Sequence, residues 1–203
     1  MDFILPKHTP LSGDRGQIEA IYVSANAVFA GVGFRAATMA KIAKGAGMSR
    51  PALYQYFDNK EHIFRSYLFA FLQESSQRMR EVFNHTSPIE ENFLAAIEAK
   101  DDAAFAEILG SPHGKEILLA SDAICGDVIE ECEVAFTKVL AEWISGGVAL
   151  GRMDHRSFAD TPEEAAYLFH QGIMGILQTV TSAEGYYKGK SQFARLFAAA
   201  LTV

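Results

Sequence analysis

The stretch from Met48 to Phe57 concentrates polar and aromatic groups that could bind a partner. It contains Arg50, whose guanidinium can form paired hydrogen bonds, together with Tyr54 and Gln55. Shortly afterwards, Lys60 places a cation at the start of a predicted helix, where the helix dipole disfavours positive charge. A bound phosphate would make this placement favourable, because backbone amides and the ammonium would both face an anion. The alternative is a solvated lysine.

Charge is unevenly divided along the chain. Residues 1–60 hold seven Lys and Arg against four Asp and Glu, a net charge of +3, whereas residues 61–203 hold 11 basic and 21 acidic residues, a net charge of −10. The whole chain therefore carries −7. A basic end on an acidic protein indicates that only this end meets a polyanion.

Three helices are predicted around the polar stretch. Apolar residues at helical spacing predict the first over residues 16–31. Thr38 is placed to cap a second helix, which Gly47 ends. Ser49 is placed to cap a third, with Pro51 in its first turn, where a missing N–H does no harm.

The third helix is too short to bury all of its side chains. Its period turns Met48, Leu53 and Phe57 inward and leaves the polar residues outside. Two short helices joined by a tight turn after a preceding helix form a helix-turn-helix arrangement, and the alternative is an ordinary helical hairpin.

The rest of the chain also predicts helices, so the expected fold class is all-α. A composition rich in Ala, Leu, Glu and Phe with six prolines favours helix. The predicted segments are a long helix from about residue 59 to residue 86, then residues 90–99, 102–109, 115–124, 127–148, 162–183 and 190–201. The start of the sequence lacks the apolar core of a secretory signal, and no apolar run approaches about 20 residues, so we expect a cytoplasmic protein without membrane contact.

Residues 35–64 resemble the DNA-binding segment of the TetR family of bacterial transcriptional regulators. The matching residues are Thr38, Ile42-Ala43, Ala46-Gly47-Met48-Ser49, Leu53-Tyr54, Tyr56-Phe57 and Lys60-Glu61. One departure is Ala37, where a second hydroxyl residue is frequent in the family. The resemblance implies a three-helix helix-turn-helix domain over 1–60, with a disordered leader at 1–14, and a helical ligand-binding and dimerisation domain over 61–203.

The resemblance also implies a palindromic double-stranded DNA operator as partner. The third helix would enter the major groove, where Arg50 would pair with guanine and Pro51 or Ala52 would touch a thymine methyl. Hydroxyls and one cation would hold the DNA backbone. The predicted DNA-binding residues are Thr38, Ser49, Arg50, Pro51, Ala52, Tyr54, Gln55, Tyr56 and Lys60.

Family habit further implies a homodimer and an unknown small-molecule effector whose binding releases the DNA, usually from a repressor. The last two helices carry an apolar stripe that is the predicted dimer interface, although it could instead belong to the internal core. Its residues are Leu168, Phe169, Gly172, Ile173, Gly175, Ile176, Val180, Phe193 and Phe197. Residues with apolar bulk and a polar tip are the effector candidates, although each could be an ordinary core or surface residue: His113, Phe136, Trp143, Tyr167, His170, Gln171 and Met174.

Other classes of function remain open at this point. The sequence has no HExxH, CxxC, nucleophile elbow or phosphate-binding glycine loop after a strand, so neither an enzyme nor a bound cofactor or metal is expected. Cys125, Cys132 and His113 could form a metal- or redox-sensing site, although buried free thiols are the simpler reading. A helical adaptor that does not bind DNA is the remaining alternative.

Overall fold

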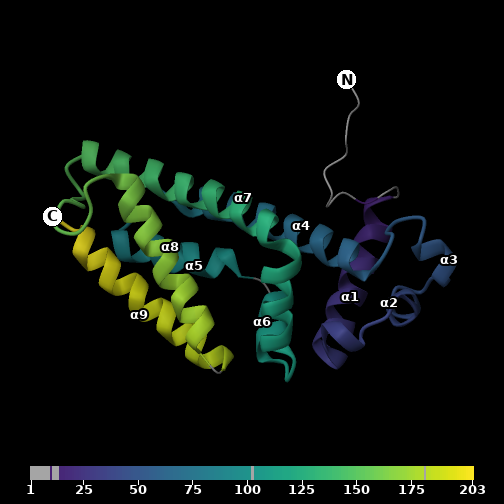
Figure 1. The fold of residues 1–203 in the computed structure, drawn as a ribbon. Coiled ribbons are helices and arrows are strands. Elements are labelled where there is room, and N and C mark those ends of the chain that lie inside the picture. The colour runs from purple at the N-terminus through teal and green to yellow at the C-terminus, as the bar shows by residue number, and fades with distance from the viewer. Residues whose placement is uncertain (1–9, 11–13, 102, 181) are drawn as a thin grey trace. The chain divides into compact units, whose positions relative to one another are not determined.

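The chain folds into α-helices, as the composition predicts. The computed structural model describes residues 10, 14–101, 103–180 and 182–203, so the predicted disordered leader lies almost wholly outside the described residues. Within that part, the only strand-like pairing is an isolated bridge between Met153 and Thr202. The helices are α1 (Arg15–Ala36), α2 (Met39–Gly45), α3 (Arg50–Leu53), α4 (Lys60–Val82), α5 (Ile89–Lys100), α6 (Ala103–Gly110), α7 (Gly114–Ala149), α8 (Pro162–Thr179) and α9 (Ala183–Leu201) (Figure 1).

The chain divides into two compact units. The first contains residues 1–72 and 103–129, and the second contains residues 73–102 and 130–203. Helices α4 and α7 therefore each contribute to both units. None of the described helices is long and apolar enough to cross a bilayer.

Side-chain caps explain where the short helices begin. The Thr38 hydroxyl accepts a hydrogen bond from the Lys41 amide at 3.3 Å, and the Ser49 hydroxyl accepts one from the Ala52 amide at 3.2 Å. Both residues cap their helices as predicted, because each satisfies an amide that has no partner within the helix.

Aromatic side chains form much of the core of the first unit. Phe29, Phe34 and Phe64 pack with ring centroids 5.1 to 5.4 Å apart. Leu53 and Phe57, which lie between Phe34 and Phe64 along the chain, are fully buried. Helix α3 is therefore held in place by the contacts of its inner face with this core.

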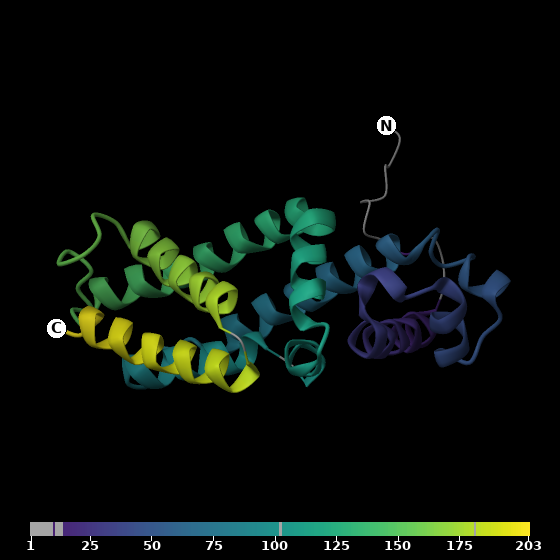
Figure 2. The same cartoon turned by 60° about the horizontal axis from the view of Figure 1, so that its bottom comes forward.

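The second unit contains α5, α8 and α9 together with the C-terminal parts of α4 and α7. Helix α9 packs against both α5 and α8 (Figure 2). Its core contains Phe93, Phe169 and Phe197, whose ring centroids lie 4.6 to 5.6 Å apart.

Several helix ends differ from the sequence prediction: α1 continues across a non-helical Gly33 to Ala36 rather than ending at residue 31, and α4 ends at Val82 rather than near residue 86. Helix α8 ends at Thr179 and α9 begins at Ala183 rather than Lys190. The Ser182 hydroxyl caps α9 by accepting from the Gly185 amide at 3.1 Å, and Tyr186 is buried, so packing outweighs the weak helix propensity of the glycines.

Helix α7 continues through the predicted break between residues 124 and 127. The backbone at Cys125 is nevertheless non-helical, with φ −123° and ψ 15°. The Arg65 guanidinium donates to the Ile124 carbonyl beside this kink and forms two hydrogen bonds of 2.7 Å with the Asp127 carboxylate. The interruption that the sequence predicts is therefore a local kink.

Candidate nucleic-acid interface

The turn between α2 and α3 depends on close backbone packing. Gly47 adopts φ +68°, a left-handed conformation that costs glycine little. The Ser24 hydroxyl of α1 donates to the Ile42 carbonyl at 2.7 Å, which ties α1 to α2. A Cβ at Gly45 would lie 2.2 Å from that hydroxyl oxygen, so only glycine permits this approach. The turn and its two helices are thereby held in one arrangement.

Helix α3 presents a polar outer surface above a buried inner face. Arg50, Pro51 and Gln55 are exposed, and Tyr54 is 40% exposed. Ala52 is half-buried. The outer side predicted from the helical period therefore matches the positions of these side chains.

Arg50 and Tyr54 contact each other on the outer surface of α3. The Arg50 guanidinium donates to the Tyr54 hydroxyl at 3.0 Å, and its carbon lies 5.5 Å from the ring centroid. Since a guanidinium carries five N–H groups, this contact leaves donors for a further acceptor. Tyr54 therefore orients the Arg50 guanidinium and leaves most of its N–H donors available.

The hydroxyls predicted to hold the DNA backbone lie at the starts of α2 and α3. Thr38 and Ser49 are both exposed, and their oxygens accept from amides, so their O–H groups remain available as donors. Tyr56 is half-buried and packs against the core of the first unit. Lys44, an exposed residue in the last turn of α2, was not among the predicted residues, and its only signal in the sequence was the local basic charge.

Lys60 has a role that the sequence did not reveal. Its ammonium donates to the carbonyls of Phe34 at 2.8 Å, Arg35 at 3.1 Å and Ala37 at 3.3 Å. The same nitrogen lies 4.7 Å from the ring centroid of Phe34. The cation that is unfavourable at the start of α4 is therefore favourable at the carbonyl end of α1.

The same corner is held from a second side by Glu116 at the start of α7. Its carboxylate accepts from the Arg35 amide at 2.8 Å and lies 3.6 Å from Nδ1 of His113. Gly33 makes room for this contact with φ +79°, and a Cβ there would lie 2.5 Å from the carboxylate. Within the first unit, α7 thus fixes the backbone that leads into α2.

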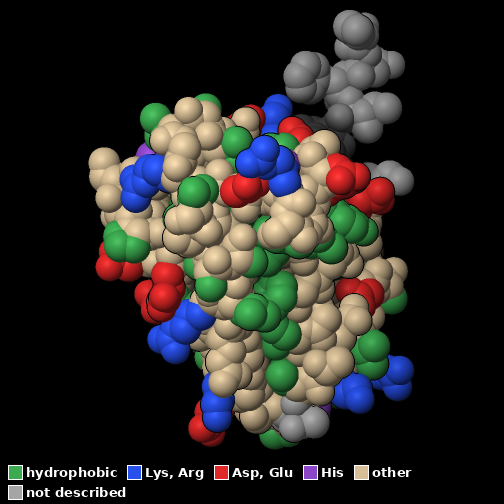
Figure 3. Space-filling view, turned by 90° about the vertical axis from the view of Figure 1, so that its left-hand side faces the viewer, with side chains coloured by type: hydrophobic (Ala, Val, Ile, Leu, Met, Phe, Trp, Pro, Cys, Tyr) green, Lys and Arg blue, Asp and Glu red, His purple; other side chains and the backbone are tan. Residues whose placement is uncertain are grey.

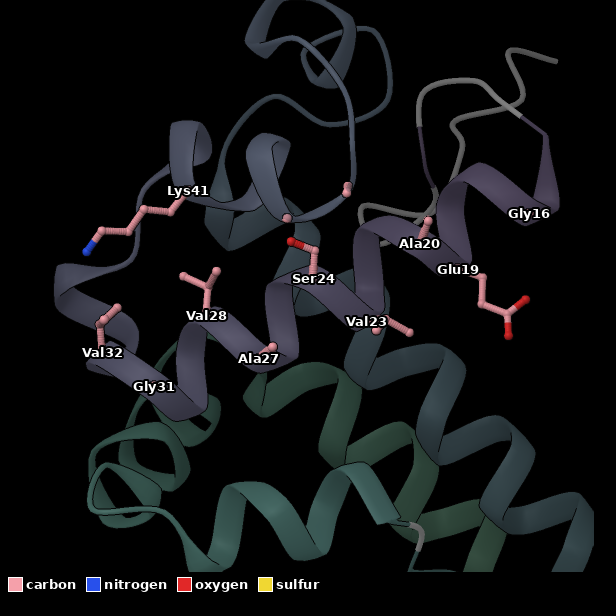
Figure 4. Close-up of a pocket in the computed structure, with 12 residues that line it drawn as sticks. Gly16, Glu19, Ala20, Val23, Ser24, Ala27, Val28, Gly31, Val32 and Lys41 are labelled. Carbon is pink, nitrogen blue, oxygen red and sulfur yellow. The ribbon is translucent and has the colours of Figure 1, made fainter.

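An open hollow of about 770 Å³ runs along the exposed side of α1, with Glu19 and Lys41 towards its two ends (Figure 4). Small residues line most of it, and Val23 on its wall is 66% exposed. This hollow lies within the first unit and contains none of the predicted DNA-binding residues.

Two of the predicted effector residues lie together in the second unit. Phe136 and His170 are both buried, with ring centroids 5.3 Å apart. Trp143 instead belongs to the core, where it stacks on Phe83 at 4.7 Å and donates to the Asn84 carbonyl at 2.9 Å.

The remaining effector candidates are dispersed. Tyr167 and Gln171 are exposed on α8, and Met174 is half-buried there. His113 lies in the first unit beside Glu116. The structure thus reduces the buried candidate site to the pair Phe136 and His170.

The predicted dimer stripe divides into internal and external residues. Phe169, Ile173 and Phe197 lie in the core of the same chain, and a Cβ at Gly172 would lie 2.2 Å from the Phe193 ring. These residues pack α8 against α9 and have little surface for a second copy, whereas Ile176 and Val180 are half-buried. Leu168 is 45% exposed and Gly175 is exposed, and Figure 3 shows hydrophobic side chains along one face at this end of the chain.

The two cysteines are free and buried. Burial raises the pKa of the Cys125 thiol to about 12 and that of the Cys132 thiol to about 11. Cys125 and His113 lie in the first unit and Cys132 in the second. In the part of the chain that the structure describes, no group of three or more His, Cys, Asp and Glu side chains could hold a metal ion.

The curated relatives match less than half of the chain. The HTH-type transcriptional activator FasR of Mycolicibacterium smegmatis is 32% identical over 90 residues, which cover 44% of this chain and 40% of the relative. The HTH-type transcriptional repressor BepR of Brucella suis is 35% identical over 85 residues, covering 39% and 41%. The matches thus span less than half the length of these relatives.

Solved structures are similar over almost the whole chain. A transcriptional regulator from Cytophaga hutchinsonii has a TM-score of 0.73 at 18% identity and covers 93% of this chain and 100% of its own. SmeT, the repressor of the Stenotrophomonas maltophilia multidrug efflux pump SmeDEF, has a TM-score of 0.67 at 16% identity, covering 95% and 92%. At these identities the similarity concerns the fold.

The fold and the exposed short helix together define an all-α helix-turn-helix protein with a helical C-terminal part. Residues 21–67 match the model of the family described as "Bacterial regulatory proteins, tetR family". The helix-turn-helix segment is therefore similar to that of TetR-family regulators, and the all-α fold is shared with solved structures of such regulators.

Proposed function

We propose that the chain is a ligand-responsive transcriptional repressor that binds a palindromic operator as a homodimer in the cytoplasm. The observation that carries the proposal is α3, whose inner face is buried while Arg50, Pro51 and Gln55 project from the outer side. A helix held in this way can enter the major groove without disturbing the core beneath it. The basic net charge of residues 1–60 adds attraction for the phosphate backbone.

Sequence readout is assigned to the outer side of α3. Arg50, oriented by Tyr54, pairs with the O6 and N7 acceptors of a guanine. Pro51 and Ala52 offer apolar contact to a thymine methyl, and Gln55 offers an amide to a base edge. This helix has few residues, so two copies on a two-fold symmetric site supply the remaining specificity.

Register on the DNA is assigned to the helix starts. The hydroxyls of Thr38, Ser49, Tyr54 and Tyr56 donate hydrogen bonds to phosphate oxygens. Lys60 contributes by holding the corner that precedes α2, because its ammonium already bonds three carbonyls. The phosphate contact inferred from its sequence position is therefore secondary in this proposal.

The homodimer is proposed to form through α8 and α9. The exposed apolar side chains Tyr167, Leu168 and Leu196 lie on these helices, with exposed fractions of 57%, 45% and 68%. The interface therefore uses the outer side of the predicted stripe, since its inner side is already packed within the chain.

The effector is proposed to bind in the second unit, beside Phe136 and His170. A solved structure of the relative SmeT is a complex with triclosan, which shows that this relative accommodates a small molecule. A ligand alters DNA binding only if it binds two conformations of the dimer with different affinity.

The alternatives receive less support. A thiol-based sensor needs an accessible thiolate, and burial raises the pKa of both thiols. Treatment with iodoacetamide should leave the native protein unmodified at neutral pH and label both cysteines in urea. A helical adaptor would have no use for exposed DNA-facing groups on α3, and the named relatives are transcriptional regulators.

Selection of bound DNA from a random pool tests the main proposal. We expect an enriched palindromic sequence whose affinity falls steeply as the salt concentration rises. In a gel-shift assay, wild-type protein should bind the selected DNA with the stoichiometry of a dimer. Enrichment of no sequence, or binding without dependence on salt, would reject DNA recognition by α3.

A further inference from the structure

Side chains from three helices meet beside the proposed effector site. His170 of α8 has its Nε2 atom 3.0 Å from an oxygen of Glu133 on α7. Phe136, one turn further along α7, lies against both His170 and Lys100 of α5. The ammonium of Lys100 is 4.7 Å from the centroid of the Phe136 ring. Charged and aromatic groups thus gather inside a mainly apolar unit.

One nitrogen of the buried His170 imidazole is left without a hydrogen-bond partner. The residue is only 3% exposed, Nε2 lies 3.0 Å from a Glu133 oxygen, and Nδ1 has no hydrogen-bond partner among the described residues. Burial lowers the pKa of His170, and the nearby charge of Lys100 lowers it further. Buried polar atoms are rarely left in this condition, so the ring is suited to bind a ligand group.

Lys100 is a cation without an ion pair among the described residues. Its neighbour Asp101 is paired with Lys190, which also donates to the Ile97 carbonyl at 3.0 Å. Burial is the main cause of a lowered pKa for Lys100. A partly desolvated ammonium that faces an aromatic ring has donors free for an anion.

We propose that Lys100, His170 and Phe136 bind the carboxylate end of a small apolar acid, which is the effector class of this protein. The inference rests on the proposed function, because it names the ligand of the same effector site. Lys100 donates to one carboxylate oxygen and protonated His170 to the other, while Phe136 contacts the apolar part of the ligand.

Binding of such an acid must take up a proton. The charged groups around His170 are Lys100 from α5 and Glu133 from α7, while the pair of Asp101 and Lys190 adds no net charge. A ligand carboxylate would add a second negative charge beside the ring and raise the pKa of His170. The imidazole, which burial keeps neutral, then becomes protonated in the complex.

Calorimetric titration of the full chain without DNA provides the test. The probes are benzoate, phenylacetate, octanoate and decanoate, each compared with its primary amide and with inorganic phosphate. We expect at least one acid to bind about tenfold or more tightly than its amide, and phosphate to bind more weakly than that acid. The measured heat should differ between phosphate and Tris buffers, because their ionisation enthalpies differ and proton uptake takes protons from the buffer.

Two substitutions locate the site. Lys100→Met should weaken binding of the acid by about 10- to 100-fold and change binding of the amide by less than about threefold. His170→Gln should abolish the dependence of the heat on the buffer. Lys138→Met is the matched control, since it removes the same charge from an exposed position on α7. Circular dichroism melting checks that each variant is folded.

Each outcome decides a different claim. Equal binding of acids and amides, phosphate binding as tight as that of the acids, or equal losses in Lys100→Met and Lys138→Met would overturn the proposed acid site. If Lys100→Met does not fold, the buffer dependence measured on wild-type protein still decides the proposal. Operator binding is measured separately in a gel-shift assay. Failure of the acid to bind would therefore not affect the DNA-binding proposal, and failure of DNA binding would not affect the proposed acid site.

Discussion

Replacement of Lys60 by methionine tests the role that the structure gives to this residue. The variant keeps most of the side-chain length and removes the ammonium that bonds the carbonyls of Phe34, Arg35 and Ala37. A hydrogen bond to a charged group contributes about 1.5 to 3 kcal/mol, but these three share one charge and are not additive. Contact with the Phe34 ring adds about 0.5 to 1 kcal/mol.

Two effects reduce the expected loss. Removing a cation from the start of α4 is favourable by about 0.5 kcal/mol, and solvent screens the half-buried ammonium. The net decrease in the free energy of unfolding should therefore be about 2 kcal/mol. In urea this corresponds to a transition midpoint about 1 M lower for the first unit.

The assay is urea unfolding of the full chain, followed by circular dichroism, beside a titration of DNA binding against salt. Lys44→Met is the control for the unfolding measurement, because it removes the same charge from an exposed position in the first unit. That control should lose less than about 1 kcal/mol. The structural role is refuted if Lys60→Met leaves the urea midpoint unchanged and lowers the salt dependence of DNA affinity by the amount expected for about one phosphate contact. The ammonium would then bind a DNA phosphate.

Three further predictions concern other parts of the first unit. Arg50→Ala should weaken binding to the selected operator by about 1 to 3 kcal/mol and alter the preferred base, and an unchanged shift assay would exclude its role in readout. Gly33→Ala should destabilise the protein by about 1 to 2 kcal/mol in thermal melting because φ is +79°, whereas Gly31→Ala, with open space around the new methyl, should not. The Arg65 guanidinium holds the pKa of Asp127 at about 2, below its ordinary value of 3.8, so this pair stabilises the fold above about pH 4. Asp127→Asn should therefore lower the urea midpoint at neutral pH, and a difference from wild type that persists as the pH falls towards 2 would contradict this assignment.

Local chemistry explains why the region around α3 could be predicted. Thr38 and Ser49 cap helices through amides three residues ahead, so their roles are encoded within one turn of chain. The same holds for Leu53 and Phe57, whose burial follows from the helical period. Short-range signals of this kind are visible in a sequence.

Contacts between distant residues and between chains are not visible in the same way. Lys60 bonds carbonyls 23 to 26 residues away, and backbone oxygens leave no trace in residue types. Similarly, an apolar stripe does not distinguish packing within a chain from packing between copies, so Phe169 and Ile173 were expected at a dimer interface although they are internal. The start of α9 was missed because Tyr186 is buried only through tertiary packing.

The hydrogen bonds from the Lys60 ammonium to main-chain carbonyls also indicate which neighbouring positions can change their side chain. Because the ammonium bonds main-chain oxygens, the side chains at positions 35 and 37 take no part in it. Arg35 is exposed, and Ala37 replaces the hydroxyl residue that is frequent in the family, yet the backbone there is still held. Substitutions at the exposed position 35 should therefore change the local surface while the path of the chain into α2 stays the same, so this position should tolerate many side chains.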